Sequence, residues 1–203
     1  MKAIVMAGGE GTRLRPLTCA VPKPMVPLLD KPMLEYAVEH LLRFGITDMA
    51  FTLGYKPAVI TEWFEDHTPR ETHIEYYIED TPLGTAGSVK NASAFVDGTF
   101  LVFSGDALTD IDVAAAADFH KRNGAAVTIV LKRMGNPLEY GVVISGDKGG
   151  VERFVEKPGW EDVFSDTINT GIYIIEPQVL DMIPDGQRFD FAKDLFPLMM
   201  QQN

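Results

Sequence analysis

The chain has 203 residues and a formal net charge of −11, with 46% hydrophobic and 23% charged residues. This composition is ordinary for a globular domain, and the acidic balance argues against a nucleic-acid partner, because phosphate backbones bind basic surfaces. No apolar run reaches the roughly 18 residues that a membrane span needs, so no membrane partner is expected. The single cysteine, Cys19, cannot form an internal disulfide and indicates a reducing compartment, so we expect a cytoplasmic protein.

The N-terminal stretch has the composition of a phosphate-binding loop. An apolar run at 2–6 predicts a buried strand, and residues 8–15 then hold three glycines within four positions, followed by Arg13 and Arg15. Glycines let the backbone adopt positive φ and bring its N–H groups close to a ligand, while guanidinium groups suit phosphate oxygens. The alternative is a strand-ending turn with solvated arginines. Neither a P-loop nor a dinucleotide fingerprint fits, because Gly11 is followed by Thr12-Arg13 instead of Lys-Ser/Thr or a third helix-opening glycine.

Helix-type and strand-type patterns alternate through residue 131. Helices are predicted over 31–44, 57–64, 88–95 and 113–122, and strands over 48–53, 74–78, 99–103 and 125–131. Later segments predict strands at 140–145, 151–155 and 170–175, a hairpin turn at 146–150, and helices at 177–183 and 191–200. Alternation favours right-handed crossovers, so we expect an α/β fold: one Rossmann-like, mixed, mostly parallel sheet flanked by helices, over residues 1–203.

Three other segments offer chemistry at predicted strand ends. Asp106 follows the strand at 99–103, at the sheet edge where open α/β folds bind ligands, and its carboxylate suits Mg²⁺; a turn aspartate is the alternative. Residues 79–87 form a second glycine turn, where a helix N-terminus would face polar ligand atoms; the alternative is a simple loop. Glu156-Lys157 follows a third strand, with a solvated ion pair as the alternative. The histidines, by contrast, are expected at the surface or at helix ends; they are His40, His67, His73 and His120.

Residues 8–18 and 22–25 together resemble the N-terminal signature of the sugar-phosphate nucleotidyltransferases. The sequence motifs at residues 83–87, 154–158 and 168–173 look most like those of the guanylyltransferase branch, which uses mannose 1-phosphate. The resemblance implies a glycosyltransferase-A-like nucleotidyltransferase fold, Mg²⁺ as cofactor, and a nucleoside triphosphate and a hexose 1-phosphate as partners. GTP with mannose 1-phosphate is expected; the alternatives are a glucose-1-phosphate thymidylyl- or uridylyltransferase, or a non-catalytic nucleotide-sugar-binding regulatory domain.

The same resemblance assigns site residues in three groups. The nucleotide would contact Ala7, Gly8, Gly9, Gly11, Thr12, Arg13, Lys23, Glu79, Gly84 and Thr85. The sugar phosphate would contact Gly141, Glu156, Lys157, Asn169 and Gly171. Asp106 would bind the metal, and the catalytic set would be Arg13, Lys23, Asp106 and Lys157. Because the attacking phosphate oxygen is already an anion, the reaction needs charge neutralisation and no general base.

The resemblance also predicts a departure from the family at the C-terminal end. Family members place a second metal-binding aspartate beyond residue 203, so the domain is expected to be truncated, to bind nucleotide and to turn over poorly. If a second carboxylate is present, Asp190 and Asp194 are the first candidates. An apolar stripe on residues 191–199 is expected to be partly uncovered. The sequence leaves the oligomeric state open, with a homo-oligomer as one alternative.

Overall fold

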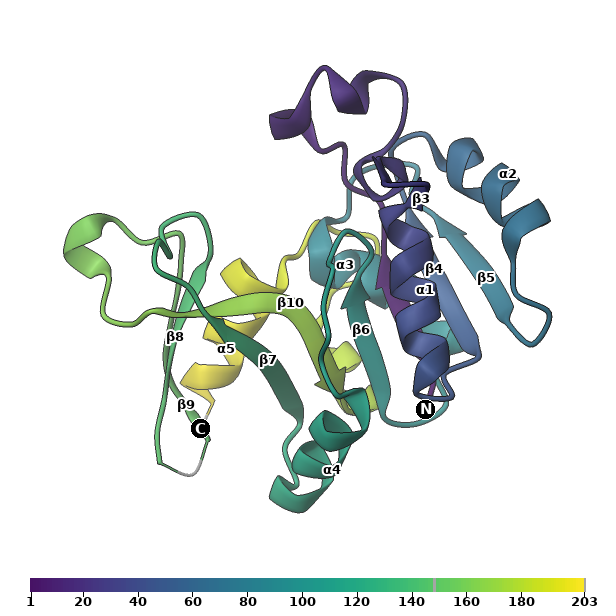
Figure 1. Ribbon diagram of the computed structural model, residues 1–203. Coiled ribbons are helices and arrows are strands. Elements are labelled where there is room, and N and C mark those ends of the chain that lie inside the picture. The colour runs from purple at the N-terminus through teal and green to yellow at the C-terminus, as the bar shows by residue number, and fades with distance from the viewer. Residues whose placement is uncertain (148, 203) are drawn as a thin grey trace.

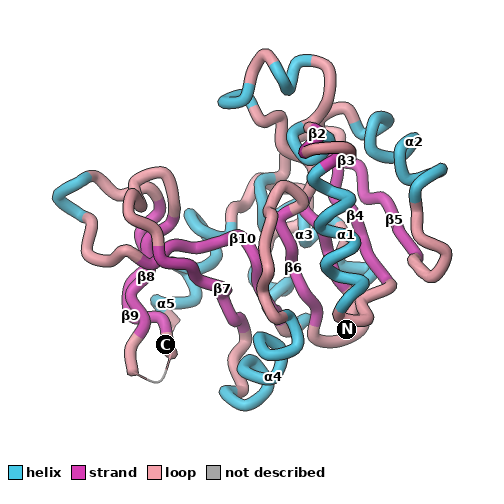
Figure 2. Tube along the Cα trace, in the orientation of Figure 1, coloured by secondary structure: helices cyan, strands magenta, loops and turns pink. Residues whose placement is uncertain are grey.

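A mixed β-sheet runs through the whole molecule in the computed structural model, which describes residues 1–147 and 149–202. Its strands follow the order β5-β4-β1-β6-β10-β8-β9, with β7 pairing the other side of β10 (Figures 1 and 2). The parallel part comprises β1 (Ala3–Met6), β4 (Asp48–Leu53), β5 (His73–Ile78) and β6 (Phe100–Ser104). The expectation of a mostly parallel α/β sheet flanked by helices is confirmed.

Four helices connect and follow the parallel strands, and their ends carry local signals. They are α1 (Met33–Arg43), α2 (Pro57–His67), α3 (Gly84–Asn91) and α4 (Val113–Asn123). Pro57 occupies the first position of α2, where its missing N–H costs nothing. Asp112 caps α4, because its Oδ1 accepts a hydrogen bond from the N–H of Ala115 at 2.9 Å.

The two faces of the sheet build separate apolar cores. In β1, Ala3 and Val5 face the core that holds α1 and α2, whereas Ile4 faces the core that holds α3. This alternation follows from the two-residue period of a strand. Figure 1 accordingly shows α1 in front of the parallel strands and α3 behind them.

The antiparallel part contains β7 (Val127–Arg133), β8 (Gly141–Ser145), β9 (Val151–Glu156) and β10 (Thr167–Ile175). Strand β10 pairs β6 through residues 173–175 and β8 through Ile168, so it joins the two parts of the sheet. Its register against β7 shifts between Asn169 and Tyr173, where Gly171 has a φ of +77°. Such a bulge bends a strand and redirects its side chains.

Short elements fill the remaining connections and both ends. Three 3₁₀ turns and a two-strand hairpin follow β1, at Thr12–Leu14, Leu17–Cys19, Lys23–Met25, β2 (Pro27–Leu28) and β3 (Lys31–Pro32). Further 3₁₀ turns lie at Ser93–Phe95, Trp160–Asp162 and Pro177–Met182. The chain then forms a π-type turn at Phe191–Leu195 that continues into α5 (Phe196–Gln201). None of the described helices is long and apolar enough to cross a membrane.

Several sequence expectations need correction. The apolar stripe at the C-terminal end is uncovered only at its far end: Phe191, Leu195 and Phe196 are buried in the core behind the sheet, near Tyr173, whereas Leu198 and Met199 are half-buried. Helix α3 begins at Gly84, four residues before the predicted start.

Two histidines lie in the last turns of α1 and α4, at helix ends as predicted, but neither is at the surface. His40 and His120 are buried, because their rings bond to partners on other elements: His40 to the carbonyl of Ile111, and His120 to Thr128 and Glu176. A hydrogen-bonded imidazole can be buried in this way without a catalytic role. One residue of the predicted hairpin turn, Lys148, lies outside the described residues.

Candidate active site

The glycine loop after β1 is held tightly against neighbouring backbone. The N–H of Ala7 donates to Thr52 at the end of β4, and the carbonyl of Gly8 accepts from Tyr55 at 3.1 Å. A Cβ on Gly8 would lie 3.1 Å from the nitrogen of Gly54, so glycine allows this close approach. Of the three loop glycines only Gly11 has positive φ, at +63°. The expectation that these glycines adopt positive φ therefore holds at one position of the three.

A cavity of about 300 Å³ opens at the carboxyl ends of β1 and β6. Its wall includes eight of the residues predicted for the nucleotide and the metal, namely Ala7, Gly8, Gly9, Lys23, Glu79, Gly84, Thr85 and Asp106. Within the described part of the chain, Gly11 and Thr12 line neither this cavity nor the one beside it. Gly11 instead shapes the wall, because a Cβ there would lie 2.7 Å from the Cβ of Lys23.

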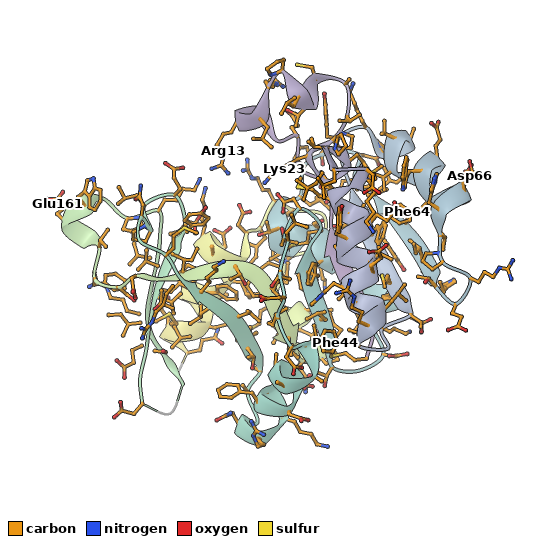
Figure 3. The ribbon with its side chains drawn as sticks, viewed as in Figure 1. Arg13, Lys23, Phe44, Phe64, Asp66 and Glu161 are labelled. Carbon is orange, nitrogen blue, oxygen red and sulfur yellow. The ribbon has the colours of Figure 1, made fainter. Side chains whose placement is uncertain are left out.

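Lys23 and Asp106 form an ion pair inside this cavity. The hydroxyl of Ser104 donates a second hydrogen bond to Asp106, at 2.6 Å from Oδ1. Burial raises the pKa of the Asp106 carboxyl, but Lys23 and Ser104 together outweigh it, so the pKa lies below its ordinary value. Asp106 is therefore ionised, with its side chain 27% exposed toward the cavity. Figure 3 shows Lys23 and Arg13 projecting from the N-terminal loops toward the middle of the molecule.

In the first turn of α3, three N–H groups are already bonded to another segment of the chain, where the sequence predicts a helix N-terminus that faces polar ligand atoms. The N–H groups of Ala86 and Gly87 both donate to the carbonyl of Phe189 at 2.9 Å. The N–H of Thr85 donates to Oδ1 of Asp190 at 3.1 Å. The segment before the C-terminal helix thus uses the N–H groups that a ligand would otherwise find.

A second cavity of about 330 Å³ lies beside the first, over the antiparallel part of the sheet. Its wall contains all five residues predicted for the sugar phosphate, which are Gly141, Glu156, Lys157, Asn169 and Gly171. Arg13 lines this second cavity and not the first, and its guanidinium lies 3.4 Å from Glu139. Thr85, Ser104 and Asp190 line both cavities, so the two spaces adjoin.

The backbone of the second cavity is shaped by the bulge in β10. Asn169 holds the bulge, because its Oδ1 accepts from the N–H of Gly171 at 3.0 Å and its Nδ2 donates to the Tyr173 hydroxyl at 2.9 Å. A Cβ on Gly141 would lie 2.8 Å from a Glu156 carboxylate oxygen, so glycine brings that carboxylate against the strand. Lys157 has a φ of +49°, a left-handed conformation that is uncommon for lysine.

The charges of the second cavity influence one another. Burial raises the pKa of Glu156 and the carboxylate of Asp190 raises it further, while Lys157 and Lys193 oppose the shift. Burial also raises the pKa of Tyr173, so its hydroxyl stays protonated and able to donate. The cavity therefore combines two lysines and Arg13 with polar donors, a set suited to a phosphorylated, hydroxyl-rich ligand.

Several cavity residues were not assigned a role from the sequence: Ser104, Glu139, Tyr173 and Lys193. Asp190, which the sequence offers only as a candidate second carboxylate, lines both cavities. Ser104 precedes Gly105-Asp106 and could have been found by its position at a strand end. Asp190 and Lys193 reach the site only through packing of the C-terminal segment, which no local pattern reveals. The described residues contain no group of three or more side chains of the metal-binding types. Asp106 and Asp190 are the two aspartates that line the first cavity.

Comparison with known proteins decides the family. The model of the nucleotidyl transferase family matches residues 2–203. The chain belongs to this family. The resemblance and the fold class inferred from the sequence are both confirmed.

Two curated relatives illustrate the range within the family. The chain is 40% identical to UTP–glucose-1-phosphate uridylyltransferase from Synechocystis, over 98% of this chain and 55% of the relative. It is equally 40% identical to mannose-1-phosphate guanylyltransferase from Mycobacterium tuberculosis, over 98% and 55%. The chain spans a little over half the length of these relatives.

Solved structures share the fold. HddC from Yersinia pseudotuberculosis, complexed with GMP-PN, superposes with a TM-score of 0.83 at 28% identity, covering 97% of this chain and 85% of HddC. A glucose-1-phosphate thymidylyltransferase described as putative, from Bacillus anthracis, gives a TM-score of 0.88 at 22% identity, over 100% and 84%. The second likeness concerns the fold alone.

Proposed function

We propose that this chain forms the nucleotidyltransferase domain of an enzyme that joins a nucleoside triphosphate to a hexose 1-phosphate and releases pyrophosphate. The observation that carries the proposal is the pair of adjoining cavities, one with the glycine loop and the Lys23–Asp106 pair, the other with Lys157. Both curated relatives named above act on a sugar 1-phosphate, which supports the same chemistry. A cytoplasmic location belongs to the proposal, since the exposed thiol of Cys19 is ordinary in a reducing compartment.

In the proposed reaction an oxygen of the sugar phosphate attacks the α-phosphorus of the triphosphate. A new P–O bond forms, the bond between the α-phosphorus and the bridging oxygen breaks, and pyrophosphate leaves with that electron pair. The nucleophile is an anion before it attacks, so no side chain needs to take a proton. The difficulty is repulsion between two polyanions, which the cations Arg13, Lys23 and Lys157 would reduce.

The site also suits the metal that the family resemblance implies. The low pKa of Asp106 keeps its carboxylate ionised, and oxygen ligands suit a hard cation. Mg²⁺ commonly takes one or two carboxylates and completes its shell with water and phosphate, so Asp106 would be one protein ligand; the poor turnover expected without a second carboxylate stays a prediction. When bound, Mg²⁺ would supply charge neutralisation to the phosphates. Lys23 would then pair with phosphate oxygens in place of Asp106.

We propose GTP as the nucleotide because of Glu79. Its carboxylate lines the first cavity, and one oxygen accepts from the N–H of Leu83 at 3.0 Å. A carboxylate only accepts hydrogen bonds, and guanine presents two neighbouring donors, N1–H and N2–H, on its Watson–Crick edge. Uracil and thymine instead place two carbonyl oxygens beside their single N–H, which a carboxylate would repel. The likeness to HddC, which was solved with GMP-PN, supports this choice.

Mannose 1-phosphate is the acceptor that accompanies GTP in the guanylyltransferase relatives, and we propose it here. A second candidate is UTP with glucose 1-phosphate. It is favoured by the Synechocystis relative, whose identity of 40% equals that of the guanylyltransferase.

The decisive experiment measures pyrophosphate release with GTP, UTP and dTTP, each combined with mannose 1-phosphate or glucose 1-phosphate in Mg²⁺. We expect GTP with mannose 1-phosphate to give the highest kcat/KM. Glu79→Gln should lower kcat/KM for GTP about tenfold or more and narrow the preference over UTP, because an amide offers one donor to a pyrimidine carbonyl. The matched control is Glu75→Gln on β5, whose carboxylate bonds Tyr77 outside both cavities. Nucleotide binding without pyrophosphate release would instead indicate a regulatory domain.

A further inference from the structure

The segment at 187–190 crosses directly over the first turn of α3. The carbonyl of Phe189 accepts from Ala86 and Gly87, and the N–H of Phe189 donates to the carbonyl of Leu83 at 2.8 Å. A Cβ on Gly84 would lie 2.8 Å from the Phe189 oxygen, and a Cβ on Gly87 would lie 2.6 Å from the Gln187 oxygen. Glycine at positions 84 and 87 is therefore what lets this crossing occur.

Asp190 and Thr85 fasten the crossing with side-chain bonds. Oδ1 of Asp190 accepts from both the N–H and the hydroxyl of Thr85, at 3.1 and 3.3 Å. The Thr85 hydroxyl in turn accepts from the N–H of Phe191 at 3.0 Å. The backbone N–H of Thr85 and its hydroxyl, as donor and as acceptor, therefore all bond to one short segment 105 residues further along the chain.

Asp190 is also connected to the second cavity. The ring of its neighbour Phe191 lies 4.8 Å from that of Tyr173, and the Tyr173 hydroxyl accepts from Asn169, which holds the bulge at Gly171. Asp190 itself lines both cavities. A continuous set of contacts therefore runs from the turn before α3, through Thr85 and Asp190, to the bulge that shapes the sugar-phosphate cavity.

We propose that Asp190 is a positioning residue that holds the two half-sites in register, so that filling the nucleotide half improves binding in the sugar half. This inference rests on the proposed function. Its carboxylate acts through Thr85, which it fixes on the nucleotide side, while Phe191 fixes the sugar side. Because the bonds at Oδ1 need an acceptor and not a charge, an asparagine at this position would preserve the arrangement.

The experiment measures calorimetric dissociation constants of GDP, which fills one half-site, and GDP-mannose, which fills both. The ratio Kd(GDP)/Kd(GDP-mannose) reports how much the sugar half adds to the nucleotide half. Asp190→Ala should lower this ratio about tenfold, Thr85→Val should lower it in the same direction, and Asp190→Asn should keep it within about twofold. If UDP binds better than GDP, the ratio is taken with UDP and UDP-glucose.

The matched control is Asp194→Ala. Oδ2 of Asp194 accepts from the N–H of Asp190 at 2.7 Å, and Asp194 lines neither cavity. This change should lower the unfolding midpoint and leave the ratio unchanged. An unchanged ratio in a folded Asp190→Ala variant, or an equal fall in Asp194→Ala, would overturn the positioning role alone. Failure of the unmodified chain to bind any of these ligands would overturn the proposed function and this inference together.

Discussion

Replacing Gly84 by alanine tests how closely the segment at 187–190 must approach α3. Gly84 has a φ of +72°, and alanine in the left-handed region costs roughly 1–2 kcal/mol. The new methyl would lie 2.8 Å from the carbonyl oxygen of Phe189, so the backbone there must move. That movement breaks the two hydrogen bonds from Ala86 and Gly87, each worth about 1 kcal/mol. We therefore expect Gly84→Ala to reduce the free energy of unfolding by about 3 kcal/mol.

Gly124 supplies the matched control, because it has a similar φ of +57° but a Cβ there meets nothing within 4 Å. Gly124→Ala should lower the free energy of unfolding only by the cost of holding alanine at positive φ, about 1–2 kcal/mol. Urea unfolding followed by circular dichroism would measure the free energies of unfolding of both variants. Equal m-values would show that the two-state comparison is valid. Gly87→Ala sharpens the test: alanine normally stabilises a helix, but this methyl would lie 2.6 Å from the Gln187 oxygen and should destabilise. Equal losses at positions 84 and 124, or a gain at 87, would refute the reasoning.

Three further predictions follow from individual side chains. The pKa of Asp106 is lowered in the folded chain, so the stability that its carboxylate contributes is complete above its ordinary value of 3.8 and is lost as the pH falls through the folded pKa. Asp106→Asn should therefore flatten the fall in urea midpoint between about pH 5 and pH 2, and should abolish most pyrophosphate release. Lys157→Ala should raise KM for the sugar phosphate roughly ten- to a hundred-fold, with little change in KM for the nucleotide. Unchanged kinetics would indicate that Lys157 is a solvated side chain that does not contact the sugar phosphate. Thr52 is fully buried in β4 and its hydroxyl has no hydrogen-bond partner among the described residues, so Thr52→Val should raise the free energy of unfolding by about 1 kcal/mol; a loss in urea titration would show that the hydroxyl is satisfied.

The sequence predicts best those features whose causes are local. The boundaries of β4 match the prediction, and Pro57 and Asp112 mark the starts of α2 and α4. These signals are contained within a few neighbouring residues, so they can be recognised without a tertiary structure. The residue types at strand ends likewise predict the position of the site, because the carboxyl edge of a parallel sheet brings these residues together.

The remaining features depend on distant partners. The early start of α3 at Gly84 requires the backbone of Phe189, and the burial of His120 requires Glu176. Asp190 enters the cavity wall only because its segment crosses a helix formed a hundred residues earlier. A pattern along the chain contains no information on such crossings, so it does not reveal that the glycines at 84 and 87 accommodate the protein's own backbone, although Gly84 also lines the first cavity.

The position of β10 in the sheet affects how the chain emerges from the ribosome. Strand β6 is complete at Ser104, but the strand that covers its outer side, β10, ends at Ile175, roughly 70 residues later. At about 5–20 residues per second, that interval lasts about 4–14 s. During this time an apolar strand edge is open to other nascent chains, and unpaired edges are the surfaces through which β-proteins aggregate. Synthesis that stops before residue 167 would therefore leave a product prone to aggregation, although its parallel strands are all present.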